Sequence, residues 1–150
     1  MSPLTTDHAD NARFRLAVQD RGLEWFSALV MIGWAVALGL PGDTLAAPAF
    51  VEFRRFGFTE QFWAAVFGIM GGARIAALYI NGRWPRTPYI RMVGSLFGTM
   101  SWAQVAWLLF AGGYFATGIP TTGVAVYGLL ALADLLSIFR AAFDARYHHP

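Results

Sequence analysis

Two oppositely charged residues lie deep inside apolar stretches of this sequence, and they are the residues best placed to do chemistry. Arg74 lies 13 positions after Gln61, and Asp134 lies 14 positions after Pro120. If both stretches are helices that cross a membrane in the same direction, the charges share a depth of about 9 Å from one end. An isolated charge at the bilayer centre costs roughly 2.5–3.5 kcal/mol, and a bidentate arginine–carboxylate contact offsets much of that cost. We therefore predict an Arg74–Asp134 ion pair, within one chain or between two copies.

Such a pair can serve as a gate, as a relay for protons or ions, or as a lock between helices; Arg74 can also extend to the lipid headgroups. Gln104, midway along the third apolar stretch, can supply an interhelical hydrogen bond. The sequence has no cysteine, and its three histidines lie at the termini. No Ser-His-Asp set, phosphate-binding loop or zinc-binding helix is recognisable. We expect no enzymatic activity, no cofactor and no metal site.

The composition of the sequence indicates what kind of secondary structure positions these residues. Of the 150 residues, 57% are hydrophobic and 13% are charged, against roughly 25% charged in ordinary soluble domains. The mean hydropathy is +0.48. Four apolar stretches each approach the roughly 20 residues needed to cross the hydrocarbon layer; they comprise residues 23–40, 61–80, 88–110 and 119–139. Helices of a soluble bundle would carry a polar face. The sequence therefore predicts an all-α integral membrane protein, with four transmembrane helices in a compact bundle that forms one domain over residues 1–150.

Small residues recur at a spacing of four in two of these stretches. Gly68 and Gly72 form one G-x-x-x-G pattern, which Ala64 extends, and Gly94 and Gly98 form another. This spacing leaves a flat strip on a helix, along which another helix can approach closely. We expect the strips to pack helices within the chain, and contacts between copies remain an alternative.

The arginines predict the orientation in the membrane. Eight of them fall on one side if the four helices alternate in direction, and two fall on the other. Because basic residues are retained in the cytoplasm, both termini are predicted to be cytoplasmic, with an amphipathic segment over residues 1–22 and a tail over 140–150. Arg83, Arg86 and Arg91 are expected to hold the second bend in the cytoplasm and to bind anionic headgroups. The net charge of +2 is too small and too dispersed to indicate nucleic-acid binding.

Two further segments have an interfacial pattern. Residues 10–22 place apolar side chains on one helical stripe, and residues 48–62 place five phenylalanines around Glu52, Arg54 and Arg55. We expect both to lie in the headgroup zone, with an ordinary helix continuation or loop as the alternative. The last bend, residues 111–118, carries no charge.

The stretch "RIAALYINGRWPRTPYIRMVGSLFGTMSW", residues 74–102, carries a pattern R-x-x-A-L-x-I-N-G…R-T-P-x-x-R. It resembles small multi-helix membrane proteins of phages and prophages of GC-rich bacteria, described as holin-like. The resemblance covers about 30 of the 150 residues. It implies a protein of the bacterial inner (cytoplasmic) membrane that assembles with itself into a membrane lesion or pore. An accessory subunit of a larger membrane or envelope complex is an alternative, and a small-ion channel or transporter is a third possibility.

Overall fold

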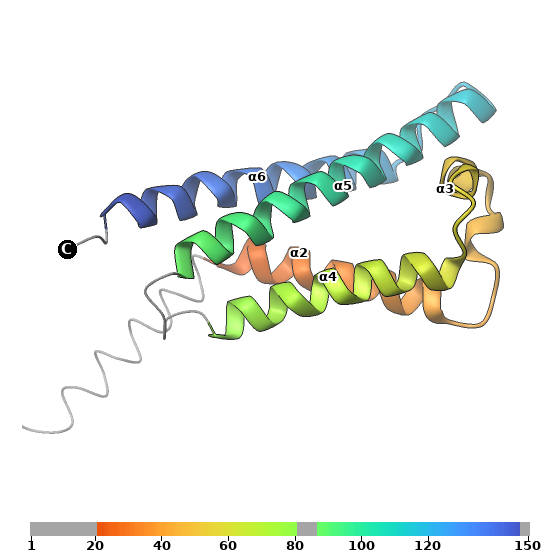
Figure 1. The fold of residues 1–150 in the computed structure, drawn as a ribbon. Helices are drawn as coiled ribbons and strands as arrows, with labels where there is room; N and C mark the ends of the chain where they lie inside the picture. Colours follow the sequence, from red (N-terminus) through yellow and green to blue (C-terminus); the bar gives the residue numbers. More distant parts are fainter. Residues whose placement is uncertain (1–20, 81–86, 148–150) are drawn as a thin grey trace, which may run out of the picture.

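The computed structural model describes residues 21–80 and 87–147, and it describes side chains for residues 21–80 and 89–143. Four long helices, each apolar enough to cross a membrane, dominate this part of the chain (Figure 1). They are α2 (Gly22–Gly39), α4 (Glu60–Ile80), α5 (Thr87–Thr117) and α6 (Gly123–Tyr147). Three short elements connect α2 to α4, namely the 3-10 turns η1 (Thr44–Ala46) and η2 (Pro48–Phe50) and the helix α3 (Val51–Arg55). The predicted all-α bundle with four transmembrane helices is confirmed.

The four helices form two pairs. α2 packs along α4, α5 packs along α6, and the two pairs face each other across one interface (Figure 1). Gly71 sets the close approach within the first pair, because a Cβ there would lie 3.0 Å from Met31 Cβ and 3.1 Å from the Ala28 carbonyl oxygen. Helix pairs that touch through small residues in this way bring their backbones close together. Far fewer residues of one pair approach the backbone of the other pair, so the contact between pairs depends on long side chains.

Aromatic side chains fill one end of the interface between the pairs. We call the end at which α3 lies the α3 end, and the opposite end, where α2 begins and α6 finishes, the terminal end (Figure 1). The aromatic cluster near the α3 end consists of Trp34, Phe53, Phe67, Trp102 and Tyr127, with Trp34 ring centroids 5.1 Å from Phe67 and 5.3 Å from Tyr127. Trp34 Nε1 also donates a hydrogen bond of 2.8 Å to the Tyr127 hydroxyl. This bond joins α2 to α6 within an otherwise apolar region.

The last two helices differ from their predicted bounds. α5 continues to Thr117 rather than ending near residue 110, so most of the predicted bend at 111–118 is helical. The two glycines in this stretch are tolerated because Gly112 allows close contact with the connecting segment; a Cβ there would lie 2.7 Å from the Ala49 carbonyl oxygen. The turn follows at Gly118, whose φ of +74° favours glycine. α6 then begins at Gly123 rather than 119 and extends to Tyr147 rather than 139.

The segment over residues 48–62 is only partly interfacial. Phe53 is fully buried in the aromatic cluster and Phe50 packs against it, whereas Phe56, Phe58 and Phe62 are exposed. η2 and α3 both contact α5, so this segment folds over the end of the bundle and closes it. The predicted amphipathic segment at 10–22 falls almost entirely outside the described residues.

Candidate functional site: a polar interface between the helix pairs

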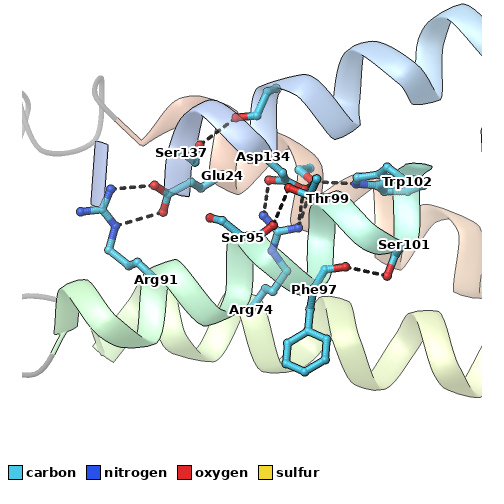
Figure 2. Close-up of polar contacts among 12 residues, drawn as sticks. Glu24, Arg74, Arg91, Ser95, Phe97, Thr99, Ser101, Trp102, Asp134 and Ser137 are labelled. Atoms are coloured by element: carbon cyan, nitrogen blue, oxygen red, sulfur yellow. Dashed lines mark hydrogen bonds and ion pairs between the residues drawn. The ribbon is translucent and has the colours of Figure 1, made fainter. Parts of the chain in front are cut away.

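Arg74 and Asp134 form a bidentate ion pair inside the bundle. Arg74 Nη1 lies 2.8 Å from Asp134 Oδ2, and Arg74 Nη2 lies 2.6 Å from Oδ1 (Figure 2). The residues are 6% and 1% exposed. The pair that the depth argument predicts is therefore present, and it forms within one chain between α4 and α6. The parallel geometry suits a planar guanidinium opposite a carboxylate and makes the contact stronger than a single hydrogen bond.

Ser27 and Trp102 extend this ion pair to the other two helices. The Ser27 hydroxyl donates a hydrogen bond of 2.7 Å to Asp134 Oδ2. Its oxygen accepts one from Trp102 Nε1 at 2.7 Å and one from Arg74 Nη1 at 3.1 Å. One residue from each of α2, α4, α5 and α6 thus meets at this point. Sequence reasoning missed both Ser27 and Trp102, although Ser27 lies about 7.5 Å into α2 at 1.5 Å per residue, close to the depth inferred for Arg74.

A second buried ion pair lies nearer the terminal end. Arg91 Nη2 is 2.6 Å from Glu24 Oε1, and Arg91 Nε donates to Glu24 Oε2 at 3.2 Å (Figure 2). Glu24 is 3% exposed and Arg91 is 8% exposed. The prediction that Arg91 binds lipid headgroups is wrong, because its guanidinium points into the bundle. Arg83 and Arg86, predicted for the same role, lie outside the described residues.

A helical stripe could have revealed this second pair. Glu24, Ser27 and Met31 follow one another at three and four positions and are all buried on α2. Arg91 and Trp102 likewise fall on one face of α5, together with buried Ser95. Residues at these spacings share a helix face, so Glu24 and Arg91 lie on the same faces of α2 and α5 as the buried core residues. We refer to Glu24, Ser27, Arg74, Arg91, Trp102 and Asp134 as the polar interface.

The glycine strip on α5 makes room for the ion pair. A Cβ at Gly98 would overlap Arg74 Nη1 and Asp134 Oδ2, and one at Gly94 would lie 3.8 Å from Arg74 Cγ. The predicted packing role of both glycines is therefore realised against a side chain that crosses from α4, rather than against a bare helix backbone. Gly98 is the position on α5 where any larger residue would displace the paired charges.

The strip on α4 matches its predicted role only in part. Ala64 packs against the core, and Gly68 faces Ala35 Cβ, which would be 3.5 Å from an added Cβ. Gly72 is exposed and a Cβ there would meet nothing within 4 Å, so its predicted packing role within the chain is wrong. The physical reason is helical phase, because α2 approaches the neighbouring Gly71 instead.

Gln104 does not join the polar interface. Its side chain is exposed on α5 and lines a surface groove with Met70 and Phe97. Its amide makes no interhelical hydrogen bond within the described residues, so the bond that the sequence predicted is not formed there. Thr99 and Ser101, the neighbouring hydroxyl residues, bond to carbonyl oxygens of their own helix (Figure 2).

The chemistry of the polar interface is that of paired charges. Each carboxylate, Glu24 and Asp134, faces an arginine in a bidentate contact, and the charges of the two pairs sum to zero. The described residues contain no group of three or more His, Cys, Asp or Glu side chains that could hold a metal ion. What the arrangement can do directly is to neutralise buried charge and to fix how the two helix pairs meet.

The fold and this interface define a four-helix, multi-pass membrane protein with charged residues buried between two helix pairs. Comparison of the chain with known protein families, with curated proteins and with solved structures found no match. Its function must therefore be argued from the interface itself.

Proposed function

We propose that this protein is non-enzymatic and permeabilises its membrane when several copies assemble into a lesion or pore. The observation that carries the proposal is the position of the buried charges. They gather between the two helix pairs, while the outer faces of the bundle present apolar side chains such as Ile69, Leu129 and Phe139. A chain built in this way already holds the polar groups that a water-filled passage would need.

The described fold fits the closed form of such a protein. Glu24 pairs with Arg91, Arg74 pairs with Asp134, and the aromatic cluster fills the same interface toward the α3 end. With its charges paired and one end packed with rings, a single chain offers ions no polar path across. Separation of the α2–α4 pair from the α5–α6 pair would expose the polar interface.

Opening requires other copies for an energetic reason. Each charge left facing lipid near the bilayer centre costs roughly 2.5–3.5 kcal/mol, so one opened chain is strongly disfavoured. Several opened chains can direct their polar interfaces toward shared water and their apolar faces toward lipid. Permeabilisation should therefore depend steeply on the amount of protein in the membrane. The resemblance of residues 74–102 to holin-like phage proteins supports the same reading.

We place the protein in the bacterial cytoplasmic membrane with both termini in the cytoplasm. The support is the uneven distribution of arginines, eight on one side and two on the other. Anionic lipids on the cytoplasmic side would favour the same orientation.

Induced expression in bacteria tests the proposal, with entry of a membrane-impermeant dye and loss of membrane potential as the measurements. The wild-type protein should accumulate without effect, and the dye should then enter the cells abruptly.

The double variant Arg74→Met with Asp134→Leu replaces the Arg74–Asp134 ion pair by apolar side chains of similar size. This variant should accumulate to the same level, and dye should enter much later or not at all. Gly33→Ala, at an exposed position outside both G-x-x-x-G patterns where an added Cβ meets nothing within 4 Å, is the matched control and should act as the wild type does. Harmless accumulation of wild-type protein at high level would contradict the proposal.

A second candidate function is that of an accessory subunit of a larger membrane complex. An open groove of about 400 Å³ between α4 and α5 favours it, since Ile69, Ala73, Val93 and Phe97 give the groove an apolar lining. A transmembrane helix of another protein could lie there. Stable association with one defined partner, together with an intact dye barrier, would favour this candidate over the pore.

A further inference from the structure

The outer face of α5 carries a row of large exposed side chains at alternating spacings of four and three residues. The row consists of Val93, Phe97, Met100, Gln104 and Trp107, and its four apolar members are between 53% and 62% exposed. We call these five residues the α5 seam. Side chains at such spacings form one stripe along a helix, as the a and d positions of a coiled coil do.

Gln104 distinguishes this stripe from an ordinary lipid-facing one. The comparable stripe on α6, at Leu132, Leu136 and Phe139, is apolar throughout. Gln104 is exposed, and its amide makes no hydrogen bond to another side chain or to the backbone within the described residues. The other described amide side chain, Gln61, lies in the first turn of α4, where headgroups and water can reach it.

Gln104 lies within the hydrocarbon part of the membrane span. It follows the first residue of α5 by 17 positions and precedes the last by 13, which places it about 26 Å and about 20 Å from the two ends at 1.5 Å per residue. The hydrocarbon layer is roughly 30 Å thick. The Cα–Cβ bond of a helical residue also tilts toward the start of its helix, which here is the more distant end. Lipid tails therefore surround this amide and offer it no hydrogen bond.

We propose that two copies of this chain pair in the membrane through the α5 seam, with the Gln104 amides of the two copies hydrogen-bonded to each other. A primary amide both donates and accepts, so two copies related by a two-fold axis satisfy each other reciprocally. Copies that share one orientation bring Gln104 to the same depth, and their α5 helices are then parallel. A polar residue at one a or d position fixes the register of such a pair. The inference rests on the proposed function only in that copies meet in the membrane, and it requires no chain to open.

The surroundings of Gln104 leave room for a partner helix. An open groove of about 240 Å³ lies beside it between α4 and α5, and Met70, Phe97 and Met100 contribute to its lining. A large seam side chain of the second copy can occupy this groove. A covering of lipid would leave the amide unpaired, which is costly in hydrocarbon. A different protein would need a polar group at the matching depth, whereas a second copy brings one with it.

Energy transfer between labelled copies measures the pairing. Full-length chains carrying Pro150→Cys as their single cysteine are labelled with a donor or an acceptor dye and mixed in lipid vesicles at a series of protein-to-lipid ratios. We expect Gln104→Leu to raise the ratio for half-maximal transfer by about tenfold, because hydrogen bonds between membrane helices are lost. Its fold should persist, since Gln104 makes no hydrogen bond within the described chain, and circular dichroism checks this.

Gln61→Leu is the matched control, because it makes the same change at an exposed amide near a helix end. It should pair as the wild type does. Equal midpoints for Gln104→Leu and the wild type would overturn the proposal. Wild-type transfer no greater than random mixing produces would also overturn it, and would point to a different partner for Gln104.

Disulfide cross-linking locates the interface. Met100→Cys places a single cysteine on the seam, and Leu132→Cys places one at an exposed position of α6. The two positions have a similar depth, because Met100 lies two residues from Gly98 and Leu132 lies two residues from Asp134, toward the α3 end, and an added Cβ at Gly98 would overlap Asp134. With a membrane-permeant oxidant, Met100→Cys should form a covalent dimer in vesicles and Leu132→Cys should not. A dimer of Leu132→Cys without one of Met100→Cys would overturn the proposed interface.

These readouts separate pairing from permeabilisation, because neither depends on dye entry. Chains that pair through the seam in vesicles that retain a trapped dye at every protein-to-lipid ratio would support the interface and contradict the permeabilising function. Release of the dye by wild-type chains whose energy transfer does not exceed random mixing would overturn the interface alone.

Discussion

The polar interface determines which helix faces meet, and this effect is more important than its contribution to the free energy of folding. Replacing a buried ion pair by apolar residues is often neutral or stabilising, while removal of one partner is strongly destabilising. Arg74 can satisfy its charge in the described chain only where Asp134 and Ser27 lie. The pairing therefore determines which face of α4 meets α6, and any rotation of either helix would leave a charge in apolar surroundings.

Gly98 lies directly beside the Arg74–Asp134 ion pair. An added Cβ would overlap Arg74 Nη1 and Asp134 Oδ2, and both side chains are held in place by Ser27 as well. We expect Gly98→Ala to lower the free energy of unfolding by about 1–3 kcal/mol, the usual cost of overpacking. Unfolding in mixed micelles measures it.

The matched control for Gly98 is Gly72→Ala. Gly72 is a helical glycine of the same kind of motif, but an added Cβ meets nothing within 4 Å. Its free energy of unfolding should be unchanged or slightly raised, because alanine loses less backbone freedom on folding than glycine does. If Gly98→Ala and Gly72→Ala changed the free energy of unfolding equally, Gly98 would not be required to make room for the ion pair.

The sequence predicts which segments form helices more accurately than it predicts where each helix ends. The apolar stretches at 23–40 and 61–80 match α2 and α4 within one residue. The predicted end of α5 was wrong because the glycines at 112 and 113 resemble a bend in sequence. Gly112 instead packs against η2, and Gly113 packs against Ile119 and Thr121 of the turn that follows; these contacts become visible only once those segments are placed. Composition cannot reveal such a contact between distant segments.

The same limit applies to the polar interface. Arg74 and Asp134 could be paired from the sequence because both lie far from the helix ends, where an unpaired charge is costly. Glu24 and Arg91 lie within a few residues of the starts of α2 and α5, and charges near helix ends ordinarily reach the headgroups. Their helical stripes place each of them on a core-facing side, and the packing of the helices then shows that they face each other.

Gly112 lies where α5 closely approaches η2. A Cβ there would lie 2.7 Å from the Ala49 carbonyl oxygen, and this neighbour is backbone, which cannot rotate away. We expect Gly112→Ala to displace η2 from α5 and to lower the free energy of unfolding by about 1–3 kcal/mol. Because Phe50 and Phe53 pack beside Trp34, the displacement should also alter tryptophan fluorescence in the folded state.

Gly128→Ala on α6 serves as the control for this experiment, since an added Cβ there meets nothing within 4 Å. It should leave both the fluorescence spectrum and the stability near those of the wild type. If Gly112→Ala behaves as this control does, the contact between η2 and α5 does not constrain the α3 end.

Orientation in the membrane is a property of the whole chain, and it rests on the distribution of the arginines between the two ends of the bundle. Four helices that alternate in direction bring the start of α2 and the finish of α6 to one end of the bundle (Figure 1). The burial of Arg91 removes one arginine from the set expected to contact headgroups. The remaining seven still outnumber Arg54 and Arg55 on the opposite side, so the predicted orientation is unchanged.

The absence of cysteine from the sequence makes this orientation directly testable, because a single introduced cysteine is a unique label. Thr44→Cys places it at an exposed position of η1 at the α3 end, and Pro150→Cys places it at the chain terminus. With both termini cytoplasmic, a membrane-impermeant maleimide should label Thr44→Cys in intact cells and Pro150→Cys only after the membrane is disrupted. Expression must stay below the level at which dye enters, since permeabilised cells would admit the maleimide as well. The reverse labelling pattern would contradict the orientation, and labelling of both variants in dye-excluding cells would mean that the chain inserts in two directions despite its arginine bias.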